Sequence, residues 1–139
     1  MADRSALASS ASRTVLAFDF GLKRIGVAVG EPELGTAHPL APVAAPGFEA
    51  IGRLIAQWRP AALVVGLPVA EQGEHALARR VERFARQLQG RYRLPVTLVD
   101  ERFSSVEAES RLRGSKRKSI DSVAAQLILE QFFDDHTAA

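Results

Sequence analysis

Short apolar runs and longer apolar stripes alternate along the chain, and together they predict a sheet covered by helices. Five runs have the length and composition of strands: Val15–Asp19, Ile25–Val29, His38–Val43, Ala62–Gly66 and Val96–Asp100. The third run contains Pro39 and Pro42, which a central strand does not accept, so it is predicted at a sheet edge. The run at Ala62–Gly66 is uniformly apolar, as strands covered on both faces are.

Other segments repeat their apolar residues at helical spacing. The stripe from Phe48 to Trp58 stops before Pro60, and longer stripes cover Leu77–Tyr92 and about Ser119–Phe133. Ser104 and Glu107 form a capping box for a further helix that runs to about Arg113. The resulting order predicts an α/β fold with a mixed five-stranded sheet, in which three antiparallel strands precede two crossover strands and helices cover both faces. The pattern itself leaves several mixed α/β folds open.

Length and composition fit one ordinary soluble domain. The chain has 139 residues, 47% of them hydrophobic, and a mean hydropathy of −0.01. We expect a single domain at residues 14–135, with a flexible Ala- and Ser-rich tail at 1–13 and a short tail at 136–139. No apolar run is long enough to span a membrane, so we expect no membrane association and a cytoplasmic location.

The residue types available limit the chemistry. The absence of cysteine excludes disulfides, thiolate nucleophiles and cysteine-bound metal clusters, as suits a cytosolic protein. The three histidines, at positions 38, 75 and 136, show no ligand spacing. A metal in this protein would therefore be held by oxygen atoms.

Asp19 is an unusual residue for its position. It ends an apolar run that is predicted to be a central strand, where a charged carboxylate is costly to desolvate unless a cation or hydrogen-bond donors meet it. This makes Asp19 a candidate site residue. An alternative interpretation is that Asp19 only accepts hydrogen bonds from the following turn, where aspartate is common.

Further acids are predicted at the same edge of the sheet. Asp100 and Glu101 follow the fifth strand, and Asp121 opens the last helix. Carboxylates gathered there would repel one another unless cations bridged them, and oxygen ligands favour Mg²⁺ or Mn²⁺. Two such ions can activate water against a phosphodiester, which outlines a nuclease site. The alternative interpretations are that the helix dipole alone favours Asp121, and that Glu101 is a surface acid paired with Arg102.

Basic residues gather in two segments that suit a polyanionic partner. The first contains Arg79, Arg80, Arg83, Arg86, Arg91 and Arg93, and the second Arg111, Arg113, Lys116, Arg117 and Lys118. We interpret the first cluster as a solvated helix face and the second as an arm that contacts nucleic acid. Gly66 ends a strand, and a glycine there also allows a nucleic-acid backbone to approach closely.

Four motifs, in order and at their usual spacing, resemble the YqgF/RuvX family. They are Asp19–Val29 (DFGLKRIGVAV), Gly66–Pro68 (GLP), Asp100–Ser105 (DERFSS) and Ile120–Ala125 (IDSVAA) with Ile128-Leu129. The resemblance covers about residues 15–133, and it implies an RNase H-like fold. Members of this family are described as pre-16S rRNA nucleases and as Holliday junction resolvases. A shorter Asp-x-Gly opening is shared with actin-like ATPases, but this chain lacks the second half of such proteins.

The resemblance also implies roles for individual residues. The catalytic, metal-binding acids of the family correspond to Asp19, Glu101 and Asp121, with Asp100 as a helper. Phosphate-contacting positions correspond to Lys23, Arg24 and Arg102. We extend the nucleic-acid-binding set to Arg113, Lys116, Arg117 and Lys118, and we expect close backbone approach at Gly21 and Gly66.

The chain departs from the family pattern at three places. Val69–Gly73 replaces an Asn-x-Asp-Gly-like segment, Ser119 replaces a glycine before the last acid, and the basic loop Gly114–Lys118 is short. The first change removes a contact that the usual aspartate would make. A short loop would reach less far around a substrate.

From these observations we predict an endonuclease that depends on Mg²⁺ or Mn²⁺. The family resemblance implies that it acts on precursor rRNA, in maturation of the 5′ end of 16S rRNA. Two alternatives remain open: a Holliday junction resolvase acting on branched DNA, and a non-catalytic RNA-binding factor in ribosome assembly. The sequence does not distinguish RNA from DNA. We expect a monomer or weak dimer, because the helices show no apolar stripe beyond those that the core requires. We also expect the ribosome as a partner.

Overall fold

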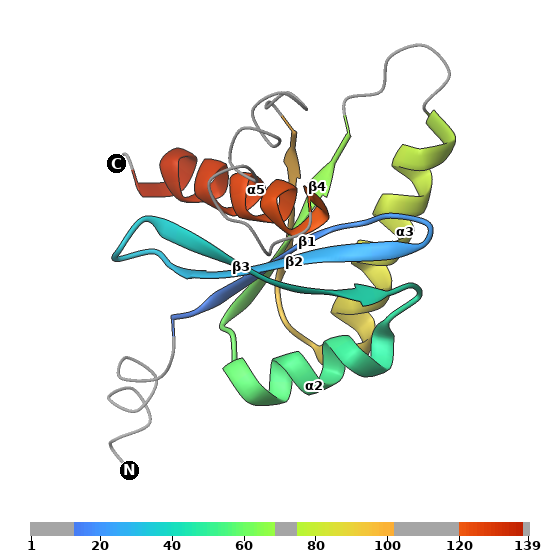
Figure 1. Ribbon diagram of the computed structural model, residues 1–139, viewed down its shortest axis with the longest axis horizontal. Coiled ribbons are helices and arrows are strands. Elements are labelled where there is room, and N and C mark those ends of the chain that lie inside the picture. The colour runs from blue at the N-terminus through green and yellow to red at the C-terminus, as the bar shows by residue number, and fades with distance from the viewer. Residues whose placement is uncertain (1–12, 69–74, 102–119, 138–139) are drawn as a thin grey trace.

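The computed structural model describes residues 13–68, 75–101 and 120–137 of the chain. Five strands and three helices are found in these ranges (Figure 1). The strands are β1 (Val15–Asp19), β2 (Arg24–Glu31), β3 (Thr36–Ala44), β4 (Ala62–Leu67) and β5 (Val96–Asp100). The helices are α2 (Phe48–Trp58), α3 (His75–Tyr92) and α5 (Ile120–Thr137).

The strands form one mixed sheet in the order β3-β2-β1-β4-β5. β1 pairs antiparallel with β2, and β2 with β3, whereas β1–β4 and β4–β5 are parallel. The proline-containing β3 lies at an edge, as predicted, and β1 lies at the centre. Because β1, β4 and β5 run in the same direction, their carboxyl ends lie at the same end of the sheet.

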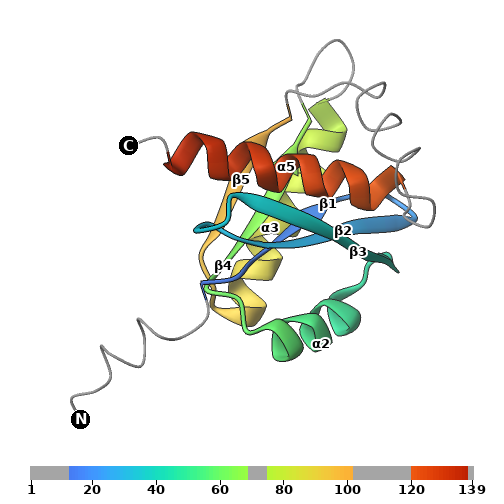
Figure 2. The ribbon, with the colours of Figure 1, turned by 60° about the vertical axis from the view of Figure 1, so that its left-hand side comes forward.

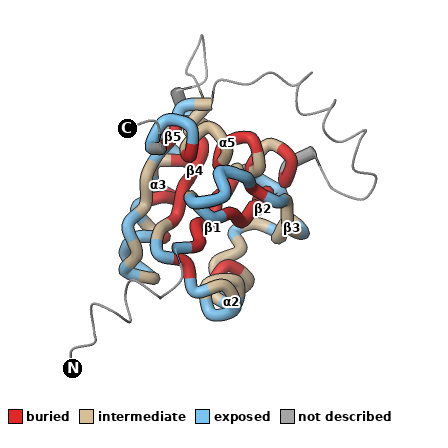
Figure 3. The backbone as a smooth tube through the Cα atoms, turned by 90° about the vertical axis from the view of Figure 1, so that its left-hand side faces the viewer, coloured by how far each residue is buried: buried red, intermediate tan, exposed pale blue. Residues whose placement is uncertain are grey.

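Each face of the sheet carries its own apolar core. Successive residues of a strand face opposite sides of the sheet. Leu16 and Phe18 of β1 pack with α2 and α3, whereas Ala17 of β1 and Val64 of β4 pack with α5. The ribbon views show α5 on one side of the sheet and α2 and α3 on the other (Figures 1 and 2). Buried positions run along β1, β2 and β4, the strands in the middle (Figure 3). The predicted α/β sheet with helices on both faces is confirmed.

Aromatic contacts hold the turn between β1 and β2 against the α3 side of the sheet. The ring of Phe20, in this turn, lies 5.0 Å from that of Phe84 on α3, and Phe84 also contacts Phe18 and Phe48. The Lys23 carbonyl oxygen accepts a hydrogen bond of 2.9 Å from the Ala45 amide. The turn that follows Asp19 is therefore anchored on both sides.

The helices match the predicted stripes, with one difference at the end of the chain. α2 ends at Trp58, and Arg59 follows in the left-handed conformation, just before Pro60. α5 continues to Thr137, four residues past the predicted end at Phe133. Its last turn contains exposed Asp134, Asp135 and His136, so the apolar pattern stops before the helix does. The predicted helix near residues 104–113 lies outside the described residues.

No helix in the described ranges combines the length and the apolarity that crossing a bilayer requires.

Candidate active site

Strand alternation directs Asp19 and Glu101 to the same face of the sheet. In β1, Val15 and Ala17 face α5, and Asp19 is the next residue in that series. Val99 of β5 also faces α5. Glu101 continues that series, because its amide still donates to the Leu67 carbonyl oxygen at 3.0 Å. Both carboxyl groups therefore lie on the α5 face, at the edge where β1 and β5 end.

Gly66 provides the space in which these two side chains meet. β4 separates β1 from β5, and Gly66 is the β4 residue opposite Val99, on the α5 face. A methyl group at Gly66 would overlap Ile128 of α5 and lie 3.1 Å from Oε2 of Glu101. The missing side chain thus admits both the helix and the carboxyl group of Glu101. These neighbours explain the glycine by packing inside the protein, and nucleic-acid approach at this position stays a prediction.

Asp19 and Glu101 are joined by a side-chain hydrogen bond. Ionised carboxylates are acceptors only, so such a bond requires a proton on one of the two groups. Burial raises the pKa of Glu101 above its ordinary value near 4.5, and the hydrogen bond with Asp19 lowers it by a smaller amount. Glu101 therefore retains its proton to a higher pH than an isolated glutamate does.

The first turn of α5 brings the backbone of Asp121 to the same region. The next residue, Ser122, is fully buried, and its Oγ accepts a hydrogen bond of 3.2 Å from the Val27 amide. Val27 pairs with Phe18, the residue before Asp19. Asp121 lies at the start of a helix, as predicted, but its side chain is outside the described part of the structure.

Asp100 is not brought together with this pair. It is exposed, and adjacent strand residues point to opposite faces, so it is directed away from the α5 face that Glu101 occupies. Its main chain contacts α5, where the carbonyl oxygen of Asp100 accepts a hydrogen bond from Gln131. Within the described residues, no group of three or more acids or histidines could hold a metal ion. The described carboxylates of the site are thus two, Asp19 and Glu101.

Two of the predicted phosphate-binding residues lie beside Asp19. Lys23 and Arg24 are exposed where the β1–β2 turn enters β2. A methyl group at Gly21 would overlap the carbonyl oxygen of Arg24, so this glycine allows the turn to close. The segment 69–73 lies outside the described residues. So do the other basic residues predicted to bind nucleic acid, which are Arg102, Arg113, Lys116, Arg117 and Lys118.

The arginines of α3 are exposed, as a solvated helix face requires. This holds for Arg79, Arg80, Arg83 and Arg86, and for Arg91, whose guanidinium lies 4.1 Å from the ring centroid of Phe48. The interpretation of this segment as a solvated face agrees with the structure.

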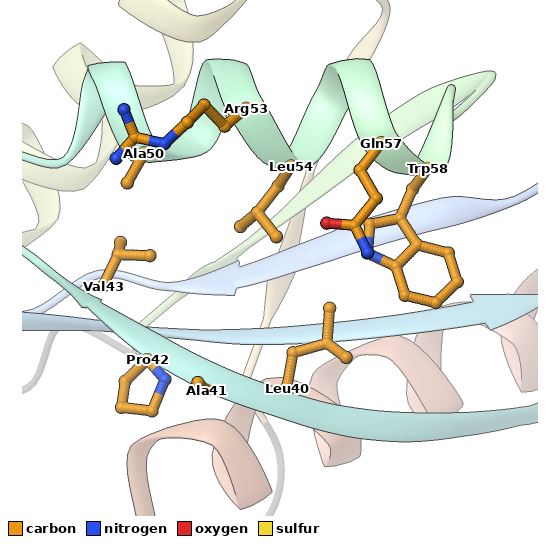
Figure 4. A pocket seen from close by; sticks show the side chains of 9 residues that line it. All are labelled: Leu40, Ala41, Pro42, Val43, Ala50, Arg53, Leu54, Gln57 and Trp58. Carbon is orange, nitrogen blue, oxygen red and sulfur yellow. The ribbon is translucent and has the colours of Figure 1, made fainter.

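Two grooves in the described part of the chain lie away from the candidate site. A groove of about 470 Å³ runs between α2 and β3, where Leu40, Val43, Leu54 and Trp58 line it (Figure 4). A neighbouring groove of about 340 Å³ shares Leu40 and Trp58. Neither contains Asp19 or Glu101 among its lining residues. The candidate site therefore lies outside both of these grooves.

Gly66→Ala is expected to damage this site and the fold together. The added methyl group must displace Ile128 or the carboxyl group of Glu101, and such overpacking costs about 1–3 kcal/mol of unfolding free energy. Gly90→Ala in α3 is the matched control, because nothing lies within 4 Å of the new methyl group. That change should stabilise the protein by about 0.4–1 kcal/mol. Urea unfolding measures both, and equal effects would contradict the packing assigned to Gly66.

Comparison with known proteins gives a consistent result. Residues 13–135 match the family model described as "RuvX: Holliday junction resolvase". A relative from Methylobacillus flagellatus is 53% identical over 91% of this chain and 94% of its own length. One from Nitrosomonas europaea is 50% identical over 96% and 97%. Both carry the name "Putative pre-16S rRNA nuclease".

Solved structures share the fold. RuvC of T. thermophilus, in complex with a Holliday junction substrate, superposes with a TM-score of 0.62 over 91% of this chain and 96% of its own, at 17% identity. The Fowlpox virus resolvase, with Holliday junction DNA, gives 0.56 over 88% and 97%, at 11% identity. At such identities the likeness concerns the fold alone. The predicted RNase H-like architecture is confirmed.

Proposed function

Because the chain belongs to the RuvX family of Holliday junction resolvases, we propose that it is a nuclease that cleaves precursor rRNA during the maturation of 16S rRNA. The names of relatives that share about half of its residues over nearly its whole length support this substrate. The observation that carries the proposal is the contact between Asp19 and Glu101 beside Gly66, where β1 and β5 of an RNase H-like sheet end. A role in rRNA processing implies a cytoplasmic location.

The donor set fits divalent cations. Asp19 and Glu101 offer hard carboxylate oxygens, of the kind that Mg²⁺ and Mn²⁺ prefer. Their shared hydrogen bond requires a proton, and a proton between two acids marks a place where a positive charge is favourable. When bound, a pair of such ions can activate water and stabilise the leaving oxygen of a phosphodiester. We assign the binding of these ions to Asp19 and Glu101, with Asp121 as the third ligand.

The protein residues then act by binding and orientation. Asp19 ends the paired strand β1 and Glu101 directly follows β5, so the backbone sets the positions of the two carboxyl groups before substrate arrives. Lys23 and Arg24 lie beside Asp19 and are assigned to phosphates of the substrate strand, which sets its register without reading sequence. The basic loop 111–118 is assigned to a more distant part of the substrate.

The experiment compares cleavage of a precursor 16S rRNA fragment and of a four-way DNA junction under the same conditions. We expect cleavage of the RNA with Mg²⁺ or Mn²⁺, and its loss when the ions are chelated. Preferential cleavage of the junction would instead establish the resolvase alternative suggested by the family description, which needs two active sites and hence a dimer. Salt-sensitive RNA binding without turnover would identify an assembly factor.

A further inference from the structure

The turn beside the candidate site carries an exposed leucine. Among the described residues, Leu22, Leu34 and Leu98 are the large hydrophobic side chains that stay exposed, and Leu22 has 65% of its surface accessible. Tight turns normally place glycine or polar residues at such positions. A single exposed leucine is common on protein surfaces, so its surroundings must decide whether it has a role.

The surroundings of Leu22 are those of a substrate contact. The residue lies between Gly21 and Lys23, three positions after Asp19, and is therefore within about 11 Å of it along the chain. Its own turn is held at Phe20, which packs on Phe84, and at the Lys23 carbonyl oxygen. Leu22 is thus an exposed apolar side chain on an anchored turn, flanked by the cation Lys23 and three residues after Asp19.

We infer that Leu22 packs against a nucleobase beside the cleaved phosphodiester and helps to unstack it from its neighbour. The inference rests on the proposed nuclease function and assigns a positioning residue to it. With phosphates bound by Lys23 and Arg24, the remaining apolar surface of the strand is the face of a base. Leucine is among the side chains that proteins insert between base steps to unstack them. The favoured substrate is then one whose cleaved bond borders an unpaired or easily unstacked nucleotide.

Leu34 provides a matched control. It is 68% exposed and lies in the connection between β2 and β3, where it lines a groove together with Thr14, the residue before β1. Asp19 ends the same strand, so Leu34 lies at the opposite edge of the sheet. Leu22→Ala and Leu34→Ala remove equal apolar surface from two exposed turns, and neither should alter the unfolding temperature.

The test uses 2-aminopurine, whose fluorescence rises when it leaves the base stack, at the nucleotide bordering the cleaved bond of the RNA. Binding is measured with Asp19→Asn protein, which should not cut the probe. We expect a fluorescence rise with Asp19→Asn and with Asp19→Asn/Leu34→Ala, and its loss with Asp19→Asn/Leu22→Ala. An equal rise in all three, or a rise in none, would overturn the inference.

Cleavage gives a second readout in otherwise unchanged protein. Leu22→Ala should lower the cleavage of a base-paired site about tenfold, the effect of roughly one lost apolar contact, and affect an unpaired site little. Leu22→Met should cleave the base-paired site at close to the wild-type rate, and Leu34→Ala should not change that rate. Equal losses at both sites would overturn the role in unstacking. If no variant cleaves any substrate, the nuclease proposal fails, and the fluorescence experiment still decides whether Leu22 meets a base.

Discussion

Asp19→Asn is expected to reduce metal-dependent cleavage by about a thousandfold or more, because it removes a charged ligand from the site where the phosphodiester reacts. The fold should remain intact. Asparagine has nearly the same shape and can donate a hydrogen bond to Glu101, so the contact seen beside Gly66 can persist. Initial rates at saturating Mg²⁺ measure the loss, and thermal unfolding in chelator should show no decrease in stability.

The control for this variant is Asp134→Asn, the same chemical change at an exposed position in the last turn of α5. It should cleave like the wild type. An Asp19→Asn protein that retains wild-type activity would mean that the reaction takes place at another site or comes from a contaminating nuclease.

Glu101→Gln is expected to lose activity to a similar extent and also to change how stability depends on pH. Burial raises the pKa of Glu101, so the folded protein holds a proton that the unfolded chain has already released above about pH 4.5. Wherever the folded state binds more protons, the free energy of unfolding falls as the pH rises. In the wild type without metal, this contribution should therefore decrease from pH 4.5 up to the raised pKa.

Glutamine has no proton to lose, so Glu101→Gln should become more stable relative to the wild type across the same pH interval. Urea unfolding of both proteins in chelator, at steps from pH 4.5 to 7.5, measures the difference. A difference that is constant with pH, or that favours the wild type as the pH rises, would show that Glu101 is not held in the buried contact described above.

Several features of the fold could be predicted from residues that are neighbours in the sequence. Proline at positions 39 and 42 excludes β3 from the centre of the sheet, and uniformly apolar β4 requires cover on both faces. Asp19 is conspicuous because a carboxylate ends an apolar strand. These features depend on neighbours along the chain, so they could be predicted without knowing which strands pair.

The choice between Asp100 and Glu101 could not be predicted in this way. Adjacent strand residues point to opposite faces, and only the packing of Val99 against α5 determines which face is which. The role of Gly66 likewise depends on Ile128, more than sixty residues later, and the anchoring of α5 depends on Ser122 meeting Val27. The motif resemblance favoured Glu101 over Asp100 as a site residue. The strand geometry explains this choice, because Glu101 faces α5 and Asp100 is directed to the opposite face.

The most direct test of the shared carboxylate site is a Mn²⁺ titration followed by thermal unfolding of four proteins: the wild type, Asp19→Asn, Glu101→Gln and the double variant. A ligand at one hundred times its dissociation constant stabilises a folded protein by about 2.7 kcal/mol. If both acids grip the same ions, each single variant loses most of the wild-type stabilisation, and the double variant loses little more. Wild-type stabilisation in either single variant, or losses that simply add, would contradict a site built from Asp19 and Glu101 together.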